Sequence, residues 1–124
     1  MVCEKIISSA CYGSDQLPVY WLTPVPELPK NAPRWLARKY LLTGSTELTM
    51  SRAKHDERNN FVKTAFNEAA VQSPNIHFVE VDKVICDQDR CYGSIDGMSL
   101  YYDEHHLSER GNKLLVDTFR RLFN

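Results

Sequence analysis

Two short strand-like runs, separated by a long stretch of mainly helical pattern, constrain the fold most. Residues 19–22 (VYWL) form a continuous apolar run, and residues 76–81 (IHFVEV) alternate as a half-buried strand does. Pro24, Pro26 and Pro29 exclude a helix directly after the first run. Two strands joined by a helical crossover form a parallel pair with a right-handed connection. A parallel sheet needs helices on both faces, so we expect an α/β fold, either a small three-layer unit or the second half of a larger one.

Four segments carry helical patterns. We expect helices over about 2–12, from Pro33 to Gly44, over about 47–73, and from about Ser108 to the C-terminus. The third is long and amphipathic, with a strongly polar first half (SRAKHDERNN). The face expected to be apolar carries Met50, Ala53, Phe61, Val62, Ala65, Phe66 and Ala69.

Length and charge narrow the class of protein. The 124 residues, 43% of them hydrophobic, fit a single domain over 1–124 that is large enough to bury a core. The net charge is -1 and neither sign forms a long block, so we expect no nucleic-acid partner. No apolar run reaches the length of a membrane span, and no secretion signal is readable. A free-standing chain of this kind would be expected in the cytoplasm.

The four cysteines bear on that expectation. Cys86 and Cys91 flank a short polar loop (CDQDRC), which is either a disulfide-closed turn or a pair of free thiols. The spacing does not fit the CxxC metal and redox motifs. A disulfide here would stabilise the fold by about 2 kcal/mol and would indicate an oxidising compartment. Cys3 and Cys11 lie too far apart on the first expected helix to bond each other there, so we expect free, half-buried thiols.

The stretch YYDEHHLSERG carries the chemistry. Asp103 precedes His106 by three positions on a loop that enters a helix. A carboxylate so placed can accept the Nδ1 proton of the imidazole and leave Nε2 as a general base. Leu107 would anchor the turn, Ser108 would cap the final helix, and Gly111 would permit a close approach. The alternative is an exposed helix start whose histidines only titrate.

A metal site is a competing interpretation of the same stretch. Asp103, His105 and His106 are all possible ligands. Adjacent histidines on a helix project about 100° apart, which makes joint ligation awkward there, although a loop would permit it.

Two further histidines carry weaker expectations. His55 lies in the polar half of the long helix and is expected to be solvated. His77 is expected on one face of the second strand, with Tyr101 or Tyr102 as possible neighbours.

The block LYYDEHHLSERG resembles the C-terminal catalytic block of SGNH (GDSL-type) esterases and acyltransferases, in which Asp, two spacer residues and His are followed by Leu-Ser and a nearby Gly. VYWLTPVPELP and CDQDRC, in the same order, resemble the last half of the SGNH domain that is fused to membrane acyltransferases of family three. The resemblance implies a flavodoxin-like three-layer fold, a periplasmic setting and an intact Cys86–Cys91 bond. It also implies that His106 is the general base and that Asp103 orients it. No cofactor is expected.

The nucleophile block of that family is not readable in this sequence. No GDS-type block, and neither of the oxyanion-hole blocks, precedes PVPE. Ser14, in GSD, comes before a strand instead of after one, and Ser94, Ser99 and Ser108 lack the strand-to-helix turn that exposes a nucleophile. We therefore expect the Asp and His parts of a Ser-His-Asp triad, on a chain that is inactive alone.

Three functions remain open. The first is transfer or hydrolysis of an acyl ester, in particular an acetyl ester, on a surface carbohydrate or small ester substrate. The second is a non-catalytic binding or assembly module, in which uncovered strand edges and helix faces promote a homo-oligomer. The third is the metal site at Asp103, His105 and His106.

Overall fold

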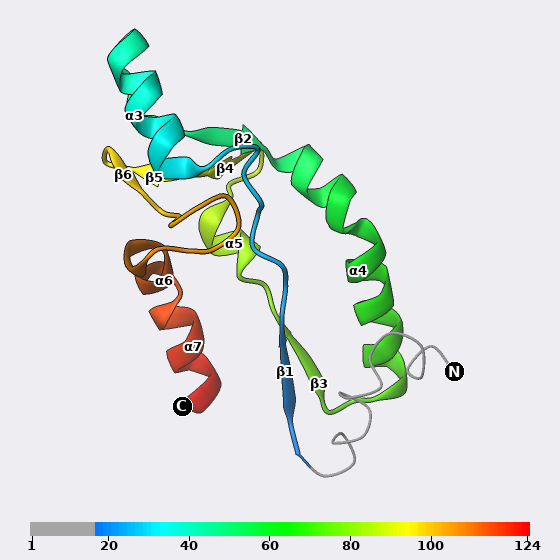
Figure 1. Ribbon diagram of the computed structural model, residues 1–124. Helices are drawn as coiled ribbons and strands as arrows, with labels where there is room; N and C mark the ends of the chain where they lie inside the picture. The colour runs from blue at the N-terminus through cyan, green and yellow to red at the C-terminus, as the bar shows by residue number, and fades with distance from the viewer. Residues whose placement is uncertain (1–16) are drawn as a thin grey trace.

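The computed structural model describes residues 17–124 (Figure 1). The helix expected over 2–12, with Cys3, Cys11 and Ser14, lies outside the described residues. In chain order the elements are β1 (Val19–Leu22), α3 (Ala32–Thr43), β2 (Thr49–Ser51), α4 (Arg52–Gln72), β3 (Ile76–Val79), α5 (Asp82–Ile85), β4 (Arg90–Tyr92), β5 (Ser94–Ile95), β6 (Met98–Ser99), α6 (Glu109–Leu114) and α7 (Val116–Phe123).

The two expected strands form a parallel pair. β1 and β3 run side by side with Val19 opposite Ile76 and Leu22 opposite Val79. Figure 1 shows α4 on one side of this pair and α7 on the other. Apolar side chains of β1 and β3 pack on Ala69 of α4, while Val79 packs with Leu115 and the apolar side chains of α7. The α/β prediction with helices on both faces is thus confirmed.

The bounds of α3 follow from local sequence. The Asn31 side chain accepts a hydrogen bond from the Arg34 amide, and Pro33 occupies the first turn, where its missing N–H costs nothing. Gly44 ends the helix with φ at 71°, and its amide donates to the carbonyl of Tyr40. These bounds match the expected ones because each signal acts within one turn of chain.

The long helix starts later than expected, at Arg52. Residues Thr49–Ser51 instead form β2, which pairs antiparallel with β4 and places Met50 opposite Cys91. Ser51 then caps α4 by accepting the Lys54 amide. Phe61, expected on the apolar face, is 70% exposed, whereas Ala65, Phe66 and Ala69 are buried as expected.

The polar loop between α5 and β4 is closed by a disulfide between Cys86 and Cys91. The side chain of Asp87 accepts the amides of Asp89 and Arg90 and so folds the loop on itself. Of the two alternatives that the sequence left open for this pair, the structure has the bonded one. The short helix α5 was not expected, and it ends the second strand at Val79 instead of Val81.

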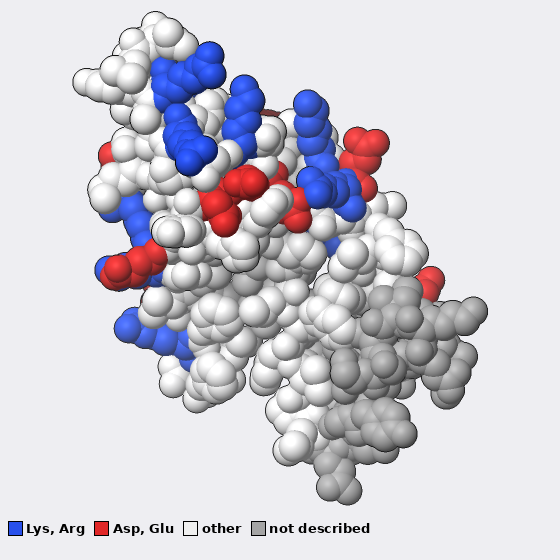
Figure 2. Space-filling model, viewed as in Figure 1, with Lys and Arg blue, Asp and Glu red and all other residues white. Residues whose placement is uncertain are grey.

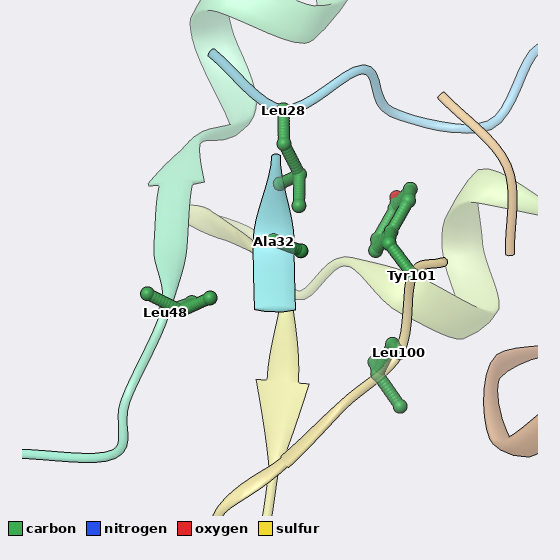
Figure 3. Close-up of a cluster of buried hydrophobic side chains, with 5 residues drawn as sticks. All are labelled: Leu28, Ala32, Leu48, Leu100 and Tyr101. Atoms are coloured by element: carbon green, nitrogen blue, oxygen red, sulfur yellow. The ribbon is translucent and has the colours of Figure 1, made fainter. Parts of the chain in front are cut away.

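A second core cluster joins three distant segments (Figure 3). Leu28 and Ala32, from the loop after β1 and the start of α3, lie between Leu48 on one side and Leu100 with Tyr101 on the other. Tyr101 is 1% exposed, and its hydroxyl donates to the carbonyl of Pro26 at 2.6 Å. The segment that leads into the DEHH motif is therefore fixed to the loop after β1.

The closing helix is divided in two at Leu115. α6 begins after Ser108, whose hydroxyl accepts the Gly111 amide at 3.2 Å as a cap. A Cβ on Gly111 would lie 2.2 Å from the carbonyl oxygen of Leu100, so only glycine permits this approach. The expected roles of Ser108 and Gly111 are both confirmed.

Of the helices over 17–124, none combines the length and apolar character of a membrane span.

Candidate functional site

Asp103 and His106 form a hydrogen-bonded pair at the surface. The Nδ1 atom of His106 lies 2.8 Å from Oδ2 of Asp103. The other carboxylate oxygen, Oδ1, accepts the backbone amides of His105 and His106, each at 2.7 Å. The Asp103 side chain is 28% exposed and that of His106 77% exposed. The acid is held within the turn while the imidazole reaches solvent.

These contacts fix the charge on the acid. Hydrogen bonds from the amides of His105 and His106, and then from the His106 ring, lower the pKa of Asp103 to about 2. A carboxylate ionised at neutral pH only accepts hydrogen bonds, so Nδ1 of His106 carries the proton it shares with Asp103. Nε2 of a neutral ring then keeps its lone pair and can take a proton from a substrate or nucleophile.

Backbone hydrogen bonds hold the loop that carries this pair. The Leu28 amide donates to the carbonyl of Glu104 at 2.9 Å, and the Ala32 amide to that of Asp103 at 3.2 Å. The loop also closes on itself, because the Tyr102 amide donates to the carbonyl of His106 at 2.8 Å. The position of the Asp103–His106 pair is thus set by the loop after β1, at the carboxyl end of a parallel strand, where α/β proteins bind their ligands.

His105 has a different partner from His106. Its Nδ1 lies 3.6 Å from Oε2 of Glu27, a residue of the loop after β1. Glu27 also forms an ion pair with Arg58 of α4. Across 17–124, the His, Cys, Asp and Glu side chains whose ligand atoms gather within 4.8 Å of one another are His55, Asp56 and Asp82, not Asp103, His105 and His106.

His55 is buried, which corrects the expectation that it is solvated. It is 2% exposed, and its Nε2 lies 3.5 Å from Oδ2 of Asp82, itself 1% exposed. The amide group of Asn59 contacts Nδ1 on the other side of the ring at 3.0 Å. The first half of α4 is polar on two sides: Lys54, Glu57 and Arg58 are exposed, while the inward side, with His55, joins this network.

Asp82 is the centre of a buried ionic network. Thr23 donates to Oδ1 at 2.9 Å, while Arg52 and Lys63 each donate to Oδ2 at 3.1 Å. Burial raises the pKa of Asp82, but the nearby His55 ring and the hydrogen bonds from Lys63 and Thr23 outweigh it and hold that pKa well below its ordinary value.

Asp56 completes the network and balances its charge. Arg52 Nε and Lys63 Nζ each lie 3.2 Å from its Oδ1. Burial lowers the pKa of Lys63, yet its bonds to Asp82 and Asp56 raise it above its ordinary value. Two cations already balance the two carboxylates. A metal ion at His55, Asp56 and Asp82 would have to displace them, so these residues do not fit a metal centre and instead fasten α4 to the ends of β1 and β3.

The serines considered as nucleophiles have structural hydrogen bonds. Ser94 accepts the Leu48 amide and donates to the carbonyl of Thr46, and Ser99 donates to the carbonyl of Tyr101. Ser108 donates to the carbonyl of Ser99 as well as capping α6. Within 17–124, no serine is hydrogen-bonded to the His106 ring.

The ring neighbour of His77 is Tyr20, and not Tyr101, one of the two tyrosines considered as possible neighbours. The His77 ring stacks on Tyr20 of the neighbouring strand, with ring centroids 5.4 Å apart. Tyr101 is held in the core cluster of Figure 3.

Glu27 carries no recognisable signal in the sequence, and His55 was expected in solvent. Arg52, Asp56, Asn59 and Lys63 recur every three or four positions, which is a polar stripe on one helix face. That stripe was the available signal for a buried network. Nothing in the sequence identified Asp82, its partner, because the two lie on elements far apart in the chain.

The fold and the site define a class: an α/β domain with an acid–histidine pair on the loop before its last helices. The family model described as "SGNH domain (fused to AT3 domains)" matches residues 9–121. The chain therefore belongs to the SGNH domain family of this AT3-fused kind. No curated protein and no solved structure gives a significant match to it.

Proposed function

We propose that this chain supplies the general base and the orienting acid for acyl-ester chemistry of the SGNH type. The observation that carries the proposal is the 2.8 Å contact between His106 Nδ1 and Asp103 Oδ2, which leaves Nε2 on an exposed ring. The substrate is an acyl ester, in particular an acetyl ester, and the acyl group is transferred to or removed from a carbohydrate.

The reaction proceeds through an acyl-serine intermediate. Nε2 of His106 takes the proton of a serine hydroxyl while the serine oxygen attacks the acyl carbon. The imidazolium then returns that proton to the departing alcohol. In the second half Nε2 takes a proton from the acceptor, a sugar hydroxyl or water, and the serine leaves as the protonated alcohol. Asp103 stabilises the imidazolium formed in each half.

The nucleophilic serine comes from outside residues 17–124 under this proposal. The structural hydrogen bonds of Ser94, Ser99 and Ser108 support it. The open face of β1 also supports it, because Tyr20 and Leu22 are 41% and 45% exposed and could be covered by the part of an SGNH domain that carries the nucleophile. Ser8, Ser9 and Ser14 precede β1 in the sequence instead of following a strand, so we also expect no nucleophile among them. By itself the chain would then turn over esters no faster than the uncatalysed reaction.

We place this chemistry in the periplasm, next to a membrane acyltransferase. The disulfide between Cys86 and Cys91 supports an oxidising compartment. The description of the family, whose SGNH domains are fused to AT3 domains, supports the membrane partner.

The test is ester hydrolysis by two proteins: the chain alone, and the chain joined to the nucleophile-bearing first half of a family member. Each is made as wild type, His106→Ala and His105→Ala. We expect the joined protein to be active, with a loss of about 10³-fold or more in His106→Ala and little change in His105→Ala. A joined protein that is inactive, or that is indifferent to His106→Ala, would overturn the proposal, as would rapid hydrolysis by the chain alone.

The exposed apolar side chains favour one second candidate, an assembly module that self-associates. Besides Tyr20 and Leu22, Phe123 at the end of α7 is 80% exposed. Light scattering across a range of concentrations distinguishes the two, since a monomer at high concentration excludes self-association as the function.

A further inference from the structure

The second half of α3 projects from the body of the molecule (Figure 1). Trp35 and Leu36, in its first half, pack against the core cluster at the start of the helix. Beyond them, Tyr40, Leu41 and Leu42 are 57%, 82% and 73% exposed. Three consecutive apolar side chains are thus left in solvent at the end of the helix, where removing their surface from water would be favourable.

The same segment is positively charged. Residues 28–46 contain no acidic residue, and their basic residues are Lys30, Arg34, Arg38 and Lys39. Lys39 donates to the backbone carbonyl of Glu47. The other three basic side chains are exposed and form no ion pair with any acid of residues 17–124. Figure 2 shows basic side chains and no acidic ones on the visible face of the projecting end. A chain with a net charge of -1 therefore gathers unpaired positive charge here.

Charged and apolar side chains share the outward face of α3. Arg34, Arg38 and Leu41 follow one another at intervals of four and three residues, which places them on one side of the helix. Trp35 and Leu36, which pack on the core, lie on the other side. Such a face is complementary to a bilayer with anionic headgroups. Guanidinium groups pair with lipid phosphates, while the apolar side chains enter the boundary between headgroups and acyl chains.

We infer that the projecting end of α3 docks on the surface of a bilayer that contains anionic lipids. The three exposed cations supply the electrostatic attraction, Leu41 and Leu42 enter the bilayer surface, and Tyr40 lies at the level of the headgroups. Neither the charges nor the short apolar end suffices alone, so the binding is reversible and depends on both.

Docking through α3 also orients the histidine loop. α3 begins at Ala32, whose amide donates to the carbonyl of Asp103 at 3.2 Å. The helix that touches the membrane is therefore bonded at its start to the loop that carries the Asp103–His106 pair. This orienting role rests on the proposed function, whereas the docking itself does not.

The test is co-sedimentation of the chain with vesicles of two compositions, phosphatidylcholine alone and an equal mixture of phosphatidylcholine and phosphatidylglycerol. We expect binding to the anionic mixture to be about tenfold or more the stronger, and to weaken as salt screens the charges. Arg34→Ala/Arg38→Ala should lower the partition coefficient about tenfold or more, because it removes two cations from the surface. Leu41→Ser/Leu42→Ser should lower it by a similar factor, because it removes the apolar end.

Two matched variants control for the loss of charge and of apolar surface. Lys113→Ala/Arg120→Ala removes two exposed cations of α6 and α7, each of which is paired with an acid. Phe61→Ser/Val71→Ser removes two apolar side chains of α4 that are 70% and 86% exposed. Both variants should bind the anionic vesicles as the wild type does.

The other outcomes overturn the inference. Equal binding to both kinds of vesicle shows that the cations are not used, and no binding shows that the bilayer is not the partner. Equal losses in the α3 variants and in the controls show that α3 is not the docking element. Light scattering tests a second copy of the chain as the occupant: an oligomer that Leu41→Ser/Leu42→Ser dissociates would mean that protein covers this end. Vesicle binding and ester hydrolysis are separate measurements, so failure of one proposal is distinguished from failure of the other.

Discussion

His106 is bonded to Asp103 through both its ring and its backbone. Oδ2 of Asp103 lies 2.8 Å from Nδ1 of the ring, and Oδ1 accepts a hydrogen bond from the His106 amide at 2.7 Å. The acid is thus fixed by the same residue that it orients. A turn of this kind forms from local sequence, and it keeps the imidazole in one tautomer without help from a distant element.

The first prediction concerns the protonation of Asp103. Its pKa of about 2 in the folded chain lies below the ordinary value of about 3.9, so the stabilisation of the turn is complete above the ordinary value and is lost as pH falls towards 2. The amide resonances of His105 and His106, followed by NMR, should move with a midpoint near 2. Asp103→Asn should abolish that transition, and a midpoint near the ordinary value would show that the two amide bonds are absent in solution.

The second prediction concerns Gly111. The Cβ of Gly111→Ala would lie 2.2 Å from the Leu100 carbonyl, which forces α6 away from the core. We expect a loss of about 2–4 kcal/mol in the free energy of unfolding, measured by urea denaturation. Gly44→Ala is the control: it meets no atom within 4 Å and suffers only from its φ of 71°, at a cost of about 1 kcal/mol. Similar losses in both variants would contradict the close approach at Gly111.

The third prediction concerns the buried network. Asp82→Asn leaves Arg52 and Lys63 without one of their two carboxylates, and the Asp82 side chain is 1% exposed. The expected loss is about 3 kcal/mol in the free energy of unfolding. Asp56→Asn, at a side chain 46% exposed, should cost about 1 kcal/mol or less. If Asp56→Asn were the more damaging change, Asp82 would not be the centre of the network.

The sequence predicted those elements whose signals are local. The cap at Ser108, the stop at Gly44 and the Asp103–His106 spacing each act within one turn of chain, and all three appear in the structure as expected. β2 was missed because it is held by β4, far along the chain, and that pairing displaced the start of α4 to Arg52. The burial of His55 was missed for the same reason, since it depends on Asp82.

The fourth prediction concerns the disulfide. Closing the short loop between Cys86 and Cys91 should contribute about 2 kcal/mol to the free energy of unfolding by restricting the unfolded chain. Thermal unfolding with and without a reductant measures this contribution. The Cys86→Ser/Cys91→Ser variant should unfold like the reduced protein whether or not reductant is present. If the oxidised wild-type protein were no more stable than this variant, the predicted contribution of the disulfide would be contradicted.

The most direct test of the central claim is a double-mutant cycle on kcat/KM for ester hydrolysis by the chain joined to the nucleophile-bearing half. The effects of substitutions at residues that act as one catalytic unit are not additive. We therefore predict that Asp103→Asn and His106→Ala each lower kcat/KM about 10³-fold or more, and that the double variant is no slower than His106→Ala alone. Two single variants that keep the wild-type rate, or losses that multiply in the double variant, would contradict the account of Asp103 and His106 as a catalytic pair.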